Sequence, residues 1–286
     1  MKKTINPEKL ATIYIISKGR PHCTTAQTLV KMRYPGEWFI VCGNNDETLQ
    51  QYIDRWGESK VLVFDWYEQI KHTDVMDNFG FEKMASGAAP VRNAVFDFSR
   101  ARGEIRHWQM DDDFTCFRLT DMKKNRNVKM SGELFYKWLV RLAQYADDAH
   151  LANIGFSLSE ECFPEMAKKF TQRVYAAHNM SNDPNLTPEW RARFNDDTIN
   201  AIDVHRLGLK KEIQVRFMAI DTKATQSEKG GLTDMYRNLG TVRKTAYLIL
   251  IAPNAAKITI RHSRYHHIVV WKKLVVKVLS EKWRKI

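Results

Sequence analysis

Cysteine is scarce in this chain. Only 4 cysteines occur among 286 residues, and they lie far apart with no CxxC pair (Cys23, Cys42, Cys116 and Cys162). This pattern argues against a zinc ribbon or a disulfide-stapled scaffold, and it predicts reduced, mostly buried thiols.

Long apolar runs are absent as well. A membrane-spanning helix needs about 18 apolar residues, whereas the longest candidate here, residues 246–252, ends at Pro253. Two lysines follow Met1, but no apolar segment stands behind them, so a secretory signal is not expected. We therefore expect a cytoplasmic protein with no membrane partner.

Two common phosphate-binding motifs are also missing. The chain has no GxxxxGK[ST], and no GxGxxG follows its first predicted strand, so it lacks the P-loop and dinucleotide-binding signatures. The composition is that of a globular protein, with 44% hydrophobic and 27% charged residues. Its length suits one large or two small domains.

Positive charge is concentrated in the last third of the chain. Residues 205–286 hold 18 Lys and Arg against 5 Asp and Glu, a net charge of +13, so the preceding residues carry −1. Such an excess predicts a surface for a polyanion, most simply nucleic acid. A basic face that only improves solubility is the alternative.

The first 120 residues alternate short apolar strands with helical stretches. Helices are predicted over residues 46–56 and from Ser86 onward, where Pro90 suits the first turn. The predicted strands are residues 11–17, 37–42, 60–64 and 106–110. This order is typical of an α/β fold with helices flanking a largely parallel sheet.

The organisation changes after residue 120. Ser131 is the expected N-cap of a helix that runs to about Asp147, and a helix from Asp197 to Leu207 is expected to end at Gly208. Residues 178–195 are rich in Asn and Pro and are predicted to form a loop. Further strands are predicted at residues 153–157, 213–220 and 245–251.

Three consecutive carboxylates follow the strand at 106–110: Asp111, Asp112 and Asp113. They repel one another unless a cation or a network neutralises them, and ligands of open α/β sheets bind at the carboxyl ends of the strands. Mg²⁺ or Mn²⁺, held by one or two carboxylates and substrate phosphate oxygens, is the simplest partner. If the strand continues, Asp111 and Asp113 point the same way and form the metal pair. A solvated acidic turn is the alternative.

Two basic segments are candidates for binding a phosphate-bearing ligand. Ser17, Lys18 and Arg20 follow the first strand, where backbone N–H groups and both cations could face a nucleotide. Arg92 and Asn93 stand near a helix start, a position suited to a phosphate or ribose. The alternatives are a plain basic loop and the exposed face of an amphipathic helix.

Asp196 and Asp197 stand at the start of a predicted helix. A carboxylate there, across a cleft from a metal-bound donor, could act as general base for an acceptor hydroxyl. Alternatively, one of the two only caps the helix. His262, His266 and His267 cluster in the basic region, and one of them could complete a metal site, although surface or DNA-facing histidines are commoner.

The order of these parts resembles glycosyltransferases of the GT-A fold, a Rossmann-type mixed sheet flanked by helices. The likeness covers most of residues 11–270 and is greatest to bacteriophage TET-associated glycosyltransferases and related hydroxymethylcytosine DNA glycosyltransferases. The segments that carry it are residues 15–21, 89–93 and 110–114, the Asp pair at 196–197, and the Gly-Gly-Leu before Tyr236.

The resemblance implies a UDP-sugar donor and a Mn²⁺ or Mg²⁺ cofactor. Asp111 to Asp113 match the DxD element of the family. Donor contacts are then expected from Ser17, Lys18, Arg20, Arg92, Asn93, Asp111, Asp112, Gly230 and Gly231, and metal contacts from Asp111, Asp113 and His262. Asp196 or Asp197 matches the place of the catalytic base in inverting members. Residues 1–120 would form the nucleotide-sugar-binding half of one continuous domain, and residues 121–286 the acceptor-binding half with its basic C-terminal elaboration.

The charge distribution favours a DNA acceptor, because a transferase for small molecules has no need of a net charge of +13 in one segment. We predict transfer to the hydroxymethyl group of a modified pyrimidine, 5-hydroxymethylcytosine, in phage double-stranded DNA within the host cytoplasm. The donor sugar stays open between glucose, N-acetylglucosamine and arabinose. Flipping of the acceptor base is expected, with Tyr265 or Trp271 as stacking candidates. The alternatives are transfer to a cell-envelope glycan, a metal-dependent nuclease and a DNA-binding protein.

Overall fold

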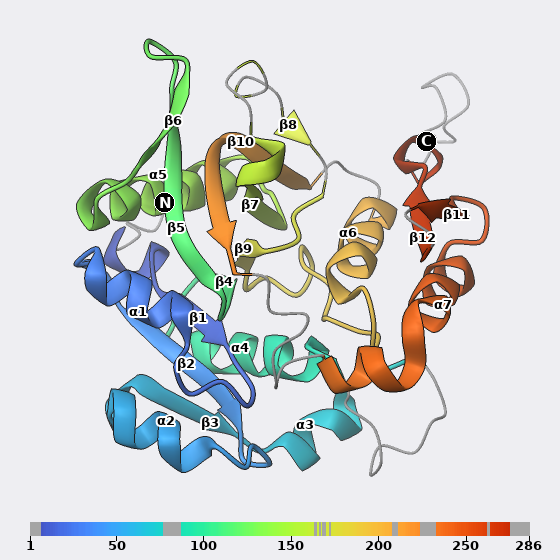
Figure 1. Cartoon of the computed structure of the whole chain (residues 1–286), viewed down its shortest axis with the longest axis horizontal. Helices are drawn as coiled ribbons and strands as arrows, with labels where there is room; N and C mark the ends of the chain where they lie inside the picture. The colour runs from blue at the N-terminus through green and yellow to red at the C-terminus, as the bar shows by residue number, and fades with distance from the viewer. Residues whose placement is uncertain are drawn as a thin grey trace, which may run out of the picture.

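A mixed sheet of ten strands forms the centre of the molecule (Figure 1). The computed structural model describes residues 7–76, 87–162, 165, 167, 170–171, 173–207, 211–223, 233–261 and 264–274. The sheet contains β1 Ile13–Ile16, β2 Trp38–Gly43, β3 Val61–Phe64, β4 Arg106–Asp111, β5 Phe114–Asp121, β6 Arg126–Lys129, β7 Asn153–Leu158, β8 Phe170–Thr171, β9 Ala177–Ser181 and β10 Glu212–Thr222. Its order is β3-β2-β1-β4-β9-β7-β10-β5-β6, with β8 paired to β10.

Seven α-helices and a separate hairpin complete the described part of the chain (Figure 1). The helices are α1 Thr24–Lys31, α2 Leu49–Trp56, α3 Trp66–His72, α4 Ala89–Ala101, α5 Gly132–Asp148, α6 Asp196–Arg206 and α7 Thr233–Ile251. The hairpin consists of β11 Ala256–Arg261 and β12 Arg264–Val269, followed by the short 3₁₀ helix η6 Trp271–Lys273. The predicted α/β fold with a mixed sheet flanked by helices is confirmed.

One part of the sheet is parallel, as the sequence predicts. It consists of four neighbouring strands, β3, β2, β1 and β4. Both faces of this region are covered. In β1, Ile13 and Ile15 enter the main core, while Tyr14 and Ile16 pack on the opposite face with residues of α4. A strand that is buried on both faces has apolar residues at every position. The continuous apolar sequence of β1 therefore predicts a strand.

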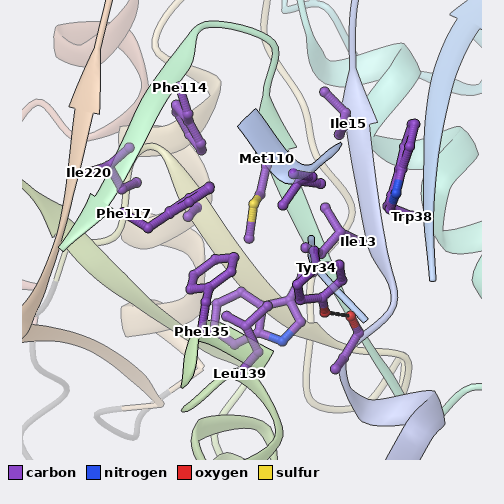
Figure 2. Packing of buried hydrophobic residues seen from close by; sticks show 14 of the residues in the cluster. Ile13, Ile15, Tyr34, Trp38, Met110, Phe114, Phe117, Phe135, Leu139 and Ile220 are labelled. Atoms are coloured by element: carbon purple, nitrogen blue, oxygen red, sulfur yellow. Dashed lines mark hydrogen bonds between the residues drawn. The ribbon is translucent and has the colours of Figure 1, made fainter. Parts of the chain in front are cut away.

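The main core joins both ends of the sheet through helices α1, α2 and α5. Figure 2 shows Phe135 and Leu139 of α5 against Phe117 of β5 and Ile220 of β10. The rings of Phe117 and Phe135 stack with their centroids 4.0 Å apart. One continuous core therefore fixes the strand ends that carry the acidic residues.

A second apolar cluster joins α6, α7 and the C-terminal hairpin. It includes Ile199 and Ile202 of α6, Leu248 of α7 and Ala256 of β11, with Trp271 partly buried against it. The basic C-terminal segment is thus attached to the helix that begins with Asp196 and Asp197.

Several predicted elements are confirmed and two are wrong. Ser131 caps α5 and accepts a hydrogen bond from the Leu134 N–H, as predicted. Residues 245–251 are the end of α7 and not a strand, because their short apolar run belongs to a 19-residue helix. Residues 178–195 are not all loop, because β9 occupies their first part as a central strand. Gly208 lies outside the described residues.

All four cysteines are free and buried, as expected. Over the described ranges, the structure holds no helix that is long and apolar enough to cross a bilayer.

Candidate active site

The carboxyl ends of β1 and β4 lie side by side, with Ile16 paired to Asp111. Strand β4 ends at Asp111, and the next two residues form the turn into β5. The expectation that the strand continues through the three aspartates is therefore wrong, and its argument for a shared orientation of Asp111 and Asp113 does not apply. Their joint binding of a metal stays a prediction.

Asp112 anchors the loop that follows β1. Its carboxylate accepts a hydrogen bond of 2.6 Å from the Ser17 hydroxyl and one of 3.1 Å from Nη1 of Arg20. The Asp112 side chain is only 7% exposed. Asp112, Ser17 and Arg20 are thus brought together as predicted, but as partners of one another, and a donor would meet this loop as a preorganised unit.

Backbone donors in the same loop are already satisfied within the protein. The N–H of Gly19 donates to Asp46 at 2.8 Å, and the N–H of Arg20 donates to the Tyr52 hydroxyl at 2.8 Å. The expectation that these N–H groups face a nucleotide is wrong. Lys18 is exposed, with its ammonium 5.9 Å from the centroid of the Trp66 ring, and remains a candidate for a phosphate contact.

Arg92 links the two halves of the site. From α4, its Nη2 donates to Asp111 and its Nε donates to Asp196, both at 2.9 Å. The side chain is 4% exposed, and its guanidinium lies 4.7 Å from the centroid of the Trp190 ring. The remaining nitrogen, Nη1, is buried and has no hydrogen-bond partner within the described structure. One N–H donor group of Arg92 is therefore left without a partner in the described structure.

Asn93, the neighbour of Arg92, bonds to the backbone of Trp190 and to neither carboxylate. Its amide oxygen accepts the Trp190 N–H at 2.8 Å, and its amide nitrogen donates to the Trp190 carbonyl at 2.9 Å. A nucleotide contact would have to break this pair of buried hydrogen bonds. The predicted donor role of Asn93 therefore has no support in the geometry, and the residue instead fixes the chain at Trp190.

Carboxylates are concentrated around the acidic turn. Burial raises the pKa of Asp111 to about 7, although Arg92 opposes the shift. Burial also raises the pKa values of Asp112 and Asp196, against the effects of Arg20 and Arg92. Arg92 bonds to Asp111 and Asp196, and Arg20 bonds to Asp112; a cluster of carboxylates of this kind suits a divalent cation.

The described residues could not bind that cation unaided. Among them, no three histidine, cysteine or carboxylate side chains are grouped as a metal site. Mg²⁺ and Mn²⁺ often take one or two protein carboxylates and complete their coordination with substrate phosphates and water. The Asp111 carboxylate bonds to Arg92 but is 35% exposed, whereas Asp112 is 7% exposed and occupied by Ser17 and Arg20; metal binding by Asp111 and Asp113 stays a prediction.

Asp196 and Asp197 occupy the first turn of α6 but neither caps it. The N-cap is Asn195, in a left-handed conformation and with no capping side-chain bond. Asp196 is fixed by Arg92, whereas Asp197 is 21% exposed and contacts Nη2 of Arg173 at 3.5 Å. The capping alternative is therefore wrong, and Asp197 is the more accessible candidate for a base.

The sequence analysis missed a buried carboxyl group next to this site. Glu212, at the start of β10, accepts the Val174 N–H at 2.9 Å and the Asn153 amide at 3.0 Å. Burial raises the pKa of Glu212 to about 8. Its partners are far away in the sequence, so no local spacing could have indicated this network. It holds the chain segment from which Arg173 reaches Asp197.

Three predicted site residues, Gly230, Gly231 and His262, lie outside the described residues. Of the neighbouring histidines, His266 is exposed and His267 is partly buried on β12. Burial lowers the pKa of His267 to about 4. The charges of Arg173 and Lys244 lower this pKa further, and the charge of Asp197 opposes them.

The acidic turn and its bridging arginine lie at the carboxyl edge of strands in a mixed α/β sheet, which is where ligands of such sheets bind. The chain is a glycosyltransferase. It belongs to the TET-Associated Glycosyltransferase family, whose family model matches residues 11–231. That span contains the loop after β1, Arg92, the acidic turn and both aspartates of α6. No curated protein sequence gives a significant match.

Solved structures similar to this chain include glucosyl-3-phosphoglycerate synthase from Mycobacterium tuberculosis. Its complex with Mn²⁺, UDP-glucose and phosphoglyceric acid has 12% sequence identity and a TM-score of 0.49, covering 91% of this chain and 86% of that chain. Another structure of the same enzyme has 14% identity and a TM-score of 0.46, covering 94% and 93% respectively.

Proposed function

We propose that this glycosyltransferase transfers a sugar from a UDP-sugar to the hydroxymethyl group of 5-hydroxymethylcytosine in phage double-stranded DNA. Charge is the observation that supports DNA as acceptor: the segment 205–286 carries 18 basic and 5 acidic residues. The TET association of the family supports a modified pyrimidine as the acceptor base. The setting would be the cytoplasm of the host.

The donor would bind at the acidic turn, in the half formed by residues 1–120. Asp111 and Asp113 would hold Mn²⁺ or Mg²⁺, which when bound would act as a Lewis acid on the departing UDP. Lys18 would contact the diphosphate, while Asp112 keeps Ser17 and the Arg20 guanidinium in place. Arg92, with its unpartnered Nη1, would orient the donor between the turn and α6.

The acceptor would bind in the half formed by residues 121–286. Asp197 would accept the proton of the hydroxymethyl group as its oxygen attacks the sugar, if the enzyme inverts stereochemistry. Arg173 would hold the Asp197 carboxylate in its orientation. Asp196 is a poor candidate for this role, because its carboxylate is committed to Arg92.

UDP release from a matrix of donors and acceptors tests this proposal. The donors are UDP-glucose, UDP-N-acetylglucosamine and UDP-arabinose, each with Mn²⁺, and the acceptors are a hydroxymethylcytosine duplex, the matched cytosine duplex and a cell-envelope glycan. We expect one donor to release UDP and the hydroxymethylated duplex to stimulate it most. Stimulation by the glycan alone would contradict the DNA acceptor, and DNA cleavage with metal but without UDP release would contradict the transferase mechanism.

A further inference from the structure

The C-terminal hairpin has one apolar face that the rest of the described protein covers only at one end. Ala256 of β11 pairs with Val269 of β12, and both pack into the cluster of α6 and α7. Residues of a strand that are two apart share a face. Ile258, Ile260 and Tyr265 therefore continue the same face, yet they are 54%, 66% and 48% exposed.

The hairpin runs along α6 toward the candidate base. Trp271, just after β12, lies with its ring centroid 5.0 Å from that of His205 in the last turn of α6. Four residues earlier, His267 lies where the charges of Asp197 and Arg173 act on it, at the other end of the helix. Tyr265 lies two residues before His267 in β12, about 7 Å further from Trp271 at 3.3 Å per residue. The exposed end of the hairpin thus lies on the side of Trp271 toward the N-terminal end of α6, the end that carries Asp197.

Apolar exposure is concentrated in this part of the molecule. Of 13 large hydrophobic side chains that are strongly exposed in the described structure, 6 lie between residues 242 and 268. Of these six, Ile258, Ile260 and Tyr265 share one face of the hairpin, and exposed apolar side chains gathered on one face often mark a binding site. A second copy of this chain, another protein or a nucleic acid could bind to such a surface. The charge of the surrounding segment distinguishes between them.

The chain segment that forms this face carries charge of one sign. Residues 235–280 contain nine Lys and Arg and no Asp or Glu. Lys257, Lys272 and Lys273 are exposed near the hairpin. An aromatic and apolar face on a segment rich in cations suits nucleobases flanked by phosphates. A second copy would instead bring its own lysines and arginines against those of the first.

We propose that Tyr265, supported by Ile258 and Ile260, is the platform on which the acceptor DNA stacks a base beside Asp197. The inference rests on the proposed function and adds the element that receives the acceptor. Trp271 is excluded from this role, because its ring is partly buried against His205 and the second apolar cluster.

The test compares Tyr265→Ala with Tyr265→Phe, which keeps the ring. Tyr145→Ala is the matched control, because Tyr145 is 50% exposed on α5, outside the proposed site. The dissociation constant for a hydroxymethylcytosine duplex is measured by fluorescence anisotropy at fixed salt. We expect about a ten- to hundredfold loss for Tyr265→Ala, the range for one base–aromatic stack, a small change for Tyr265→Phe and none for the control.

A second readout reports stacking itself. With 2-aminopurine next to the target base, its fluorescence should be quenched on binding the full chain and less quenched with Tyr265→Ala. Equal DNA affinity and quenching for the full chain and Tyr265→Ala would overturn the platform, while sugar transfer to DNA would preserve the proposed function. No DNA binding or transfer by the unaltered chain would overturn both. A dimer that Tyr265→Ala breaks, without any change in DNA affinity, would assign the face to a second copy.

Discussion

The Nε of Arg92 donates a hydrogen bond of 2.9 Å to Oδ2 of Asp196. The same guanidinium bonds to Asp111 at the end of β4, so one side chain joins the proposed donor side of the site to the first turn of α6. Arg92 is 4% exposed and Asp196 is 10% exposed, so their contact is shielded from water, whereas the Asp111 carboxylate is 35% exposed. The two ends of the site are therefore held at a fixed separation.

Replacing Arg92 should destabilise the protein as well as inactivate it. In Arg92→Met, two carboxylates lose their shared cation, and breaking a buried ion pair typically costs about 3–5 kcal/mol. The free energy of unfolding is measured by urea titration. Arg100→Met, at an exposed position of the same helix, should change it by less than about 0.5 kcal/mol. Similar losses in the two variants would show that the bridge carries no stability.

The acidic turn should separate into a structural and a functional part. Asp113→Ala should abolish sugar transfer, because Asp113 is proposed to bind metal. Asp112→Asn removes a buried carboxylate that accepts bonds from Ser17 and Arg20, and hydrogen bonds to charged groups contribute about 1.5–3 kcal/mol. We expect a lower melting temperature and a higher KM for the donor. Metal-dependent turnover by Asp113→Ala would remove that residue from the site.

Asp197→Asn should slow transfer without weakening UDP binding. The asparagine cannot take a proton from the acceptor hydroxyl, and loss of a general base typically costs about 10²–10⁴-fold in rate. Single-turnover transfer and the Kd for UDP are measured on the same sample. Asp203→Asn, later in α6 and paired with Arg191, is the control for changes in the helix. Transfer at an undiminished rate would assign the base elsewhere.

Glu212 should make stability depend on pH. Burial raises the pKa of this carboxyl from 4.5 to about 8, so the native state holds the proton to higher pH than the unfolded chain does. The stabilisation from protonation is complete below about pH 4.5 and is lost as the pH rises through about 8. Glu212→Gln, which is neutral throughout, should flatten this decline between pH 5 and 8.

The measurement is the free energy of unfolding at several pH values for both proteins. At pH 8 we expect Glu212→Gln to be at least as stable as the unaltered chain, because it avoids a buried charge. Parallel pH profiles for the two proteins would contradict a raised pKa of Glu212.

Much of the sheet could be predicted because burial on both faces leaves a local pattern. Residues 13–16 and 38–43 are continuous apolar strands, whereas β4, which leads into the acidic turn, is buried but mixed in composition. β9 was hidden because His178 and Asn179 are polar, although both are fully buried. The end of α7 was mistaken for a strand because a short apolar run is compatible with either structure.

The composition of the site was easier to predict than its connections. Ser17, Arg20, Arg92, the acidic turn and Asp196 do lie together, but the sequence does not show that Asp112 is paired to Arg20 or that Arg92 spans two carboxylates. Arg92 and Asn93 have different partners because their side chains point in different directions from α4. Glu212 had no signal, since its partners Asn153 and Val174 are distant in the sequence.

Mass spectrometry of nucleosides tests the central claim most directly. Duplex DNA containing 5-hydroxymethylcytosine is incubated with the protein, Mn²⁺ and each UDP-sugar, then digested to nucleosides. The account predicts a new nucleoside that is heavier than 5-hydroxymethyl-2′-deoxycytidine by one sugar residue. It should be present with one donor and absent with Asp113→Ala. Unchanged nucleosides with every donor, while UDP is released to another acceptor, would contradict it.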